Sequence, residues 1–209
     1  MIDVEPCYEQ HGYGHAYGRF TDADVRCANW TAVLAGASAG IGYGAHGMFQ
    51  WYRAGEPFAG EAFSPTPYDW RQVLHAPGAF DVTALRDFIE THSRAGLRPH
   101  QELLVDPPPG VRAAVVPDGS RALIYAPWPT ALTLAVDEPA EWTASQWTLE
   151  DRRWRHPRIT IRPGELYVDN PAAMGDSVLL LTRPAHPAAT PALRLPARAA
   201  STAQERPQP

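Results

Sequence analysis

The chain has 209 residues, of which 44% are hydrophobic, and a formal net charge of −5 at pH 7. This length suffices for one large domain or two small ones. The negative charge argues against nucleic acid as a partner. No apolar run reaches the roughly 20 residues that span a bilayer, so we expect no membrane segment. The first residues lack the basic start and apolar stretch of a secretion signal, which leaves the localisation open.

The first predicted elements are a strand, a loop and a helix. Residues 1–7 are typical of a short strand that ends at a Glu-Pro pair, because proline cannot donate to a sheet ladder. Residues 10–20 contain three glycines and three aromatic rings, a composition typical of a loop that lines a site. Thr21 is a typical helix N-cap, and the helix is predicted to run to about Ala37.

A second strand, a short helix and a longer helix follow. We predict a strand over 41–51, a short helix over 69–75, and a longer helix that Asp81 caps. The longer helix carries Leu85, Phe88, Ile89 and His92 on one face. The alternation of strands and helices indicates parallel strands joined by crossover helices. Two such strands are not stable alone, because a parallel sheet needs cover on both faces.

The composition changes after about residue 98. Short strands are predicted at 111–117, 121–127, 131–136, 158–162, 165–169 and 177–182. A Pro-Asp-Gly turn signal at 117–119 separates two of them. This spacing predicts a small antiparallel β-sandwich over 98–183. Residues 184–209 hold almost no large apolar side chain, and we expect this Pro/Ala-rich tail to be disordered.

Three short motifs are typical of other chemistries, but the predicted elements around each motif argue against that function. Residues 36–40 match the G-x-S-x-G motif of serine hydrolases, but the predicted helix precedes the motif and the strand follows it. Residues 42–47 match G-x-G-x-x-G, but strand follows where a dinucleotide site needs a helix. His11 and His15 stand four apart in a glycine-rich loop, where helical metal geometry is not expected. The two cysteines also lack metal-like spacing, and we expect neither metal nor cofactor.

Glu5 is the strongest candidate for a catalytic residue. A carboxylate at the carboxyl end of a parallel strand occupies the position where barrel enzymes carry out their chemistry. Tyr8 follows it closely, and Gln50 and Trp51 fall at the end of the adjacent predicted strand. An aromatic face beside hydrogen-bonding amides suits a sugar ring. The alternatives are a surface ion pair for Glu5 and core packing for Trp51.

The second part of the chain is rich in aromatic residues, which leaves two interpretations. The residues in question are Tyr125, Trp128, Trp142, Trp147, Trp154 and Tyr167. They could form a ligand platform, or they could fill the sandwich core and its interface with the first part, which is the interpretation that we favour because such rings bury large areas.

Several motifs recur in order in a known family. They are Glu5-Pro6-Cys7-Tyr8-Glu9, Asp24-Val25-Arg26, Leu34-Ala35-Gly36-Ala37, Tyr43-Gly44-Ala45-His46-Gly47, Gln50-Trp51 and Pro77-Gly78-Ala79. In these motifs residues 3–98 resemble the apiosidase-like glycoside hydrolase family. The following stretch, to about 183, resembles a domain that commonly follows and carries the label collagen-binding, although its usual turn motif is degenerate near Trp147.

The resemblance implies a fold, an activity and site residues. Residues 1–97 would be the C-terminal part of a (β/α)8 TIM barrel, with strands seven and eight. Glu5 would be the nucleophile of a retaining glycosidase, and Tyr8, His46, Gln50 and Trp51 would shape the sugar subsite. The acid/base carboxylate would lie on strand four, outside this chain, so the expected partners are a carbohydrate substrate and the N-terminal portion of the barrel. The alternative is a non-catalytic module that binds carbohydrate or protein through the sandwich, beside a vestigial barrel remnant.

Overall fold

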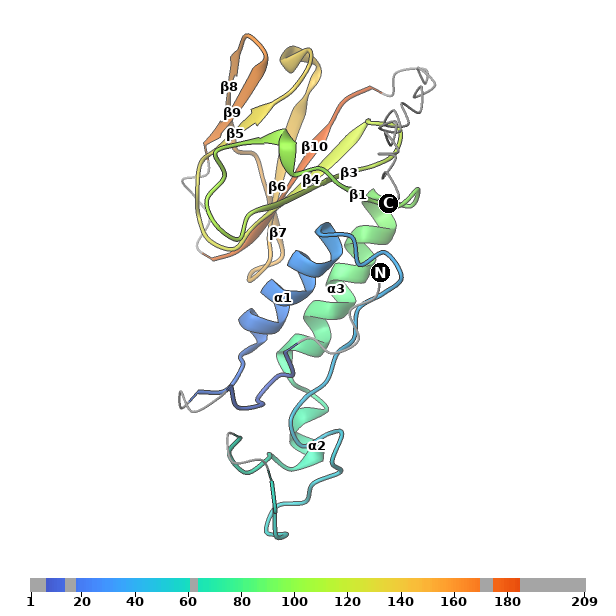
Figure 1. Ribbon diagram of the computed structural model, residues 1–209, viewed down its shortest axis with the longest axis vertical. Helices are drawn as coiled ribbons and strands as arrows, with labels where there is room; N and C mark the ends of the chain where they lie inside the picture. The colour runs from blue at the N-terminus through green and yellow to red at the C-terminus, as the bar shows by residue number, and fades with distance from the viewer. Residues whose placement is uncertain (1–6, 14–17, 61–63, 170–174, 185–209) are drawn as a thin grey trace, which may run out of the picture.

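The computed structural model describes residues 7–13, 18–60, 64–169 and 175–184. The predicted strand over 1–7 therefore lies outside the described residues except for its last position, and so does the tail from 185 onward. In these described residues, three α-helices precede ten strands, and they are α1 (Asp22–Leu34), α2 (Trp70–Val73) and α3 (Pro77–His92). Two short 3-10 helices, Gln101–Leu103 and Pro139–Glu141, lie among the strands. In Figure 1, α1 and α3 lie side by side beneath the β-sandwich, and α2 lies farther from it.

The strands form two antiparallel sheets. Their bounds are β1 Arg98–Pro99, β2 Leu104–Val105, β3 Arg112–Val115, β4 Arg121–Ala126, β5 Leu132–Ala135, β6 Thr143–Thr148, β7 Arg153–Arg155, β8 Arg158–Arg162, β9 Glu165–Asp169 and β10 Ser177–Thr182. The larger sheet has the order β1-β3-β4-β10-β6-β7, and the smaller has the order β2-β5-β9-β8. Buried apolar side chains from both sheets form one core between them. The prediction of a sandwich is confirmed as a β-rich part with two packed sheets.

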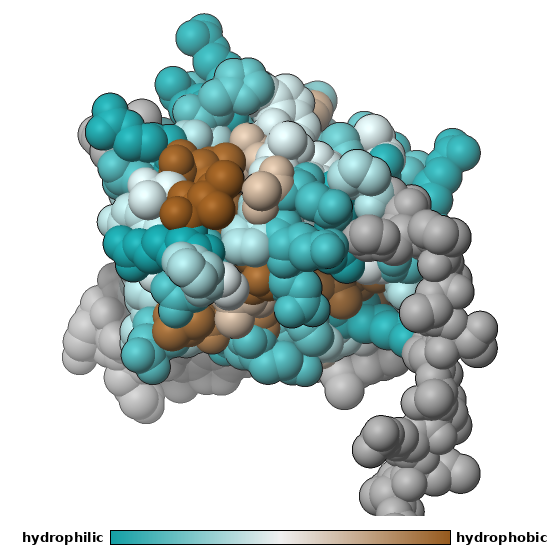
Figure 2. Space-filling model, turned by 90° about the horizontal axis from the view of Figure 1, so that it is seen from above, coloured by the Kyte–Doolittle hydropathy of each residue, from teal (hydrophilic) through white to brown (hydrophobic). Residues whose placement is uncertain are grey.

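The larger sheet is covered on both faces, and its central strands carry that signature in their sequence. Strand β4 is buried from Ala122 to Ala126, and β10 is buried from Ser177 to Leu181. Such continuous apolar runs are typical of strands without a solvent face. One face of these strands packs into the sandwich core and the other packs against α1 and α3. The surface at the sandwich end is mainly hydrophilic, with small separate hydrophobic patches (Figure 2).

Six predicted strands are confirmed within a few residues, but the short strands β1 and β2 and the strands β6 and β7 were not predicted. Strand β6 buries Gln146 and Thr148, polar residues that weaken a hydrophobic pattern. The Gln146 side-chain amide donates to Ser177 Oγ at 3.0 Å, so part of its polar surface is satisfied inside the sheet. Buried polar residues of this kind are tolerated because they are hydrogen-bonded. Pairing of β6 with β10, and not its composition, makes this segment a strand.

The N-terminus of α1 is as predicted, while its end comes earlier. Thr21 Oγ1 accepts from the Asp24 backbone N–H at 3.2 Å, and Asp24 Oδ2 accepts from the Thr21 N–H at 2.8 Å. This reciprocal capping box satisfies two otherwise unpaired donors. The helix ends at Leu34, short of the predicted Ala37, because Gly36 adopts a φ of 107° that no helical residue has.

The prediction of a strand over 41–51 is wrong, because no strand falls in this range and Ala45 forms only an isolated bridge. Ala45 forms a parallel bridge with Glu9, and α1 lies between these two segments in the chain. Residues 46–51 then form a turn. Gly47 has a φ of 116°, and a Cβ there would collide with the Tyr68 carbonyl oxygen. Residue 47 must therefore be glycine, because the close Tyr68 backbone leaves no room for a Cβ. Its positive φ is also not the backbone conformation of an extended strand.

Helix α3 begins four residues before the predicted cap. Pro77 occupies the first turn, where its missing N–H leaves no bond unmade. Asp81 lies inside the helix and is buried, so it is not the cap. Its carboxylate instead forms ion pairs with Arg26 and Arg152. Within the described residues, no helix is long and apolar enough to cross a membrane.

Candidate active site

Glu9 joins the two segments that run parallel. Its N–H donates to the Gly44 carbonyl at 2.9 Å, and its carbonyl accepts from the His46 N–H at 2.8 Å. Its side chain is 1% exposed, and Oε2 accepts from the Tyr43 hydroxyl at 2.6 Å and from the Gly78 N–H at 3.0 Å. Glu9 thereby fixes the loop after the first predicted strand to the first turn of α3.

Burial raises the pKa of Glu9 above its ordinary value, and Asp22 and Asp81 raise it further. The hydrogen bonds from Tyr43 and Gly78 oppose this shift because they favour the carboxylate. Burial also raises the pKa of Tyr43, and the Glu9 carboxylate adds to that effect. Tyr43 therefore remains a hydrogen-bond donor, and the pair acts as an anchor for the surrounding loops.

His46 directly follows Ala45, the residue that forms the parallel bridge with Glu9. It is 1% exposed, and its Nδ1 lies 3.4 Å from Arg19 Nη1 and 3.5 Å from Ser64 Oγ. The His11 ring stands edge-on to it, with ring centroids 4.7 Å apart. Arg19 in turn donates to the Gln10 and Thr66 carbonyls at 2.7 Å each. These contacts hold three loops around one imidazole.

The structure brings together two of the predicted subsite residues. Tyr8 packs against Phe49 with ring centroids 5.4 Å apart, and Phe49 lies 6.0 Å from the His46 ring. Phe49 is half exposed and was not predicted as a site residue. Glu5, the predicted nucleophile, lies outside the described residues.

Gln50 and Trp51 lie in the turn and not at a strand end. The side-chain carbonyl of Gln50 accepts from the Gly47 N–H at 2.8 Å, which stabilises the turn. Trp51 is 66% exposed and has a φ of 52°. Its ring lies edge-on to Trp70, with centroids 5.1 Å apart. Core packing is therefore not the role of Trp51, and its ring presents a free aromatic face.

Sequence reasoning missed most of the polar residues that position this site. Glu9 and Tyr43 appeared only inside the family motifs, and neither Arg19 nor the aromatic residue Phe49 was predicted as a site residue. The hydrogen-bond partners of Glu9, Arg19 and Tyr43 lie between 9 and 69 positions away in the chain, so no local spacing marks these residues. In the part of the chain that the structure describes, no group of three or more His, Cys, Asp or Glu residues is placed to hold a metal.

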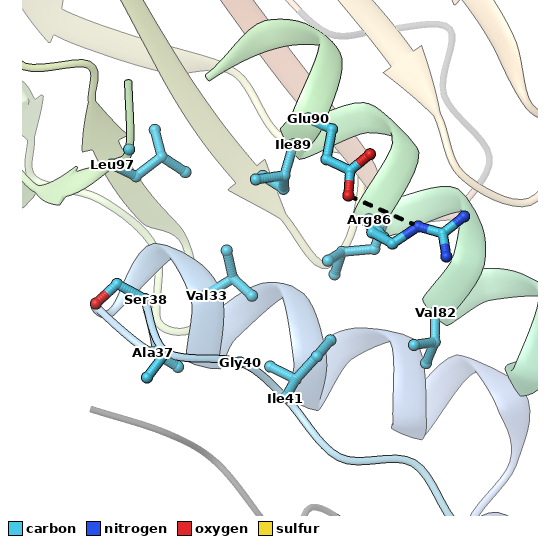
Figure 3. Close-up of a pocket in the computed structure, with 13 residues that line it drawn as sticks. Val33, Ala37, Ser38, Gly40, Ile41, Val82, Arg86, Ile89, Glu90 and Leu97 are labelled. Carbon is cyan, nitrogen blue, oxygen red and sulfur yellow. Dashed lines mark ion pairs between the residues drawn. The ribbon is translucent and has the colours of Figure 1, made fainter. Parts of the chain in front are cut away.

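An apolar cavity of about 480 Å³ lies apart from these residues, between α1, α3 and the loop that joins α1 to residue 41. Figure 3 shows Val33, Ile41, Val82, Ile89 and Leu97 pointing into it. Its polar edge is the ion pair between Arg86 and Glu90, which are 3.9 Å apart. This lining offers no pair of carboxylates and is suited to packing, not to glycoside chemistry.

In this arrangement α1 joins two parallel segments, and Glu9 and His46 lie where the segments meet. A comparison with known protein families agrees with it. Residues 1–95 match the family model for the apiosidase-like catalytic domain. The predicted resemblance is thus confirmed for this part, which is apiosidase-like in sequence. The match stops before β1, so a collagen-binding domain is not shown by it.

Solved structures with a similar fold include a glycoside hydrolase, with a TM-score of 0.73 and 20% identity over 88% of this chain. A glycoside hydrolase family 5 protein from Bacteroides vulgatus gives a TM-score of 0.71 and 20% identity over 89% of the chain. This chain spans 42% of the length of each. A search of curated proteins found no match. The apiosidase-like part and the sandwich together therefore have the fold of part of a glycoside hydrolase.

Proposed function

We propose that residues 1–97 are the closing units of a (β/α)8 barrel in a retaining glycoside hydrolase, with Glu5 as the nucleophile. The observation that carries this proposal is the apiosidase-like match over residues 1–95. The parallel bridge between Glu9 and Ala45, with α1 as the crossover, supports it because barrel strands are joined in this way. In this arrangement residues 98–183 are the accessory β-domain.

The proposed reaction uses two carboxylates about 5–5.5 Å apart. The Glu5 carboxylate attacks the anomeric carbon while the glycosidic C–O bond breaks and the acid/base residue protonates the leaving oxygen. Water then attacks the glycosyl ester, loses its proton to the same acid/base residue and releases the sugar and free Glu5. The acid/base residue belongs to strand four of the barrel and is supplied from outside these 209 residues.

Side chains of the described loops would shape the sugar subsite. Tyr8 and His46 both pack against Phe49 and supply a phenol and an imidazole. Trp51 supplies an exposed ring, and Gln50 holds the turn that carries it. Four residues after Glu5, the buried carboxylate of Glu9 holds the backbone that follows the nucleophile.

The apolar cavity between α1 and α3 supports the proposal that this chain binds a protein partner, the N-terminal portion of the barrel. Val82, Leu85 and Ile89 line it from α3, and Ile41 lines it from the preceding loop. Apolar helix surface of this kind packs against sheet in a closed barrel. The 209-residue chain alone should consequently bind an added N-terminal portion and should lack activity without it.

The test is a protein in which the preceding barrel strands are joined to this chain. Glu5→Gln should reduce turnover of an aryl glycoside by at least about a thousandfold, with substrate binding retained, since the amide cannot act as the nucleophile. For Glu5→Ala, added azide should restore turnover and give a glycosyl azide. Glu56→Gln, at an exposed glutamate in the loop after Tyr52, is the matched control.

Two results would end the assignment. One is unchanged turnover in the Glu5→Gln protein. The other is glycosidase activity of the purified 209-residue chain, which lacks the proposed proton donor.

The alternative function, a carbohydrate-binding module, is favoured by one specific observation on the sandwich, an exposed tryptophan beside a groove.

A further inference from the structure

A groove of about 290 Å³ lies where the second half of α3 meets strands β6 and β7. Three aromatic side chains line it, Phe88 from the helix and Trp147 and Trp154 from the strands, together with Asp87, Thr91 and His92. The groove is remote from the candidate active site. Thr91 lies thirteen positions after Gly78, which holds Glu9, in the same helix, a distance of about 20 Å along the axis.

Trp154 is held rigidly but is not covered. Its ring stacks on Phe88 at a centroid distance of 5.7 Å and an angle of 26°. Trp147 and His92 pack against it at 5.1 and 5.6 Å. Nevertheless 43% of Trp154 remains exposed, on a strand at the edge of the larger sheet. A ring fixed by its neighbours loses little entropy when a ligand stacks on it.

Hydrogen-bonding groups border these rings. The Asp87 carboxylate is exposed and accepts from Arg86, while its second oxygen is free for other donors. Thr91 donates its hydroxyl proton to the Asp87 carbonyl at 2.7 Å, which leaves the hydroxyl oxygen as an acceptor. Burial, with a smaller effect of Arg121, lowers the pKa of His92, so its ring is neutral at pH 7 and both donates and accepts.

We propose that this groove is a carbohydrate-binding site, in which one sugar ring stacks on Trp154 and its hydroxyl groups bond to Asp87, Thr91 and His92. A sugar has an apolar face and a polar rim, and the groove offers an aromatic face beside polar groups. Its volume lies at the small end of ligand pockets, which suits one ring of a longer chain. The site stands on this geometry alone and does not require hydrolase activity.

A quaternary ammonium ligand is the competing chemistry, because aromatic rings with a carboxylate also bind such cations. That mode needs rings that face one another across a space. Here the rings of Phe88, Trp147 and Trp154 touch each other at 5.1–6.5 Å between centroids. They form one continuous surface and no cage, which favours a flat sugar face.

The test uses the full chain on an array of soluble plant and bacterial oligosaccharides, followed by calorimetric titration of the strongest binder. Trp154→Ala should weaken binding at least about tenfold, because the stacking face is lost. Trp128→Ala removes a tryptophan of the sandwich with the same exposed fraction, 43%, and should leave affinity within about twofold of wild type. Trp154→Phe should give an intermediate affinity, and Asp87→Asn should weaken binding without loss of fold.

Several outcomes would overturn the site. These are an absence of oligosaccharide binding by the wild-type chain, an equal effect of Trp128→Ala, and displacement of the sugar by millimolar choline. Loss of binding in Trp51→Ala with full binding in Trp154→Ala would instead place the sugar at the candidate active site. If Trp154→Ala does not fold by near-ultraviolet circular dichroism, the Trp154→Phe and Asp87→Asn proteins decide the question.

Discussion

At the scale of single residues, two glutamates four positions apart have different roles. Glu5 is proposed as the nucleophile, whereas Glu9 is buried and bonded to Tyr43 and Gly78. A Cβ on Gly78 would stand 2.5 Å from Glu9 Oε2, so the helix start must be glycine for the carboxylate to reach the backbone N–H. This position explains why Pro-Gly begins α3, a motif that the family resemblance included without a physical reason.

The raised pKa of Glu9 predicts a pH dependence of stability. Its folded pKa lies above the ordinary 4.5, so the folded state binds more protons than the unfolded state in this range. The contribution of Glu9 is therefore fully present below pH 4.5 and is lost as the pH rises through the folded pKa. Glu9→Gln should remove this decline, as measured by urea unfolding from pH 4 to 8.

The matched control for that measurement is Glu56→Gln, which removes an exposed carboxylate and should keep the wild-type pH profile. A Glu9→Gln protein whose free energy of unfolding changes with pH in parallel with wild type would contradict the role given to this residue.

At the scale of elements, α1 holds the helices and the larger sheet together. Trp30 lies between Phe88 of α3 and Tyr125 of β4, at centroid distances of 5.4 and 6.2 Å. One turn earlier, Arg26 Nη1 donates to Asp81 of α3 at 2.8 Å, and Nε donates to Asp176 before β10 at 2.9 Å. Apolar packing supplies the affinity of this interface, and the charges fix its geometry.

Removal of the arginine should be costly because the buried Asp176 carboxylate loses its ion pair and Asp81 keeps only the one with Arg152. Arg26→Met is expected to lower the free energy of unfolding by about 3–5 kcal/mol. Arg86→Met, on the exposed side of α3, breaks a solvated ion pair and should leave stability unchanged within error. Urea unfolding followed by tryptophan fluorescence measures both. Equal effects of the two substitutions would show that the buried network contributes nothing specific.

At the scale of the whole molecule, the helices and the sandwich share a buried cluster. Trp30 and Leu34 of α1 and Phe88 of α3 are buried in it with Leu123 of β4 and Leu180 of β10. The central strands β4 and β10 of the larger sheet thus have no free face, although residues 98–183 contain all of the strands of this sheet. The helical part is therefore required to cover an apolar face of the sheet, whatever chemistry it carries.

This shared cluster predicts the behaviour of the isolated sandwich. A protein of residues 98–183 should expose Leu123, Tyr125 and Leu180, bind the dye ANS and self-associate, because uncovered apolar surface of this extent drives association. The 209-residue chain should bury these side chains and bind less dye per molecule. Light scattering and dye fluorescence at equal concentration provide the comparison. A monomeric, dye-free sandwich would contradict the role of α1 and α3 as its cover.

Local sequence patterns were enough to predict one helix cap, six strands and the resemblance of the first part to a known family. Thr21 and Asp24 are three residues apart, and the apolar runs of β4 and β10 are continuous, so neighbouring residues suffice to predict the cap and the strands. The ordered motifs around Glu5, His46 and Trp51 identified the apiosidase-like part, and the family model confirms it over residues 1–95.

The contacts between distant side chains became known only from the folded chain. Glu9 and Gly78 are 69 residues apart, and Arg26 and Asp176 are 150 residues apart. Residue 47 must be glycine because the Tyr68 backbone approaches it closely, and no pattern within that segment indicates this contact. The stack of Trp154 on Phe88 likewise joins an edge strand to a helix. The physical reason is that local periodicity reports the burial of each residue, whereas the identity of its partner depends on how distant elements pack.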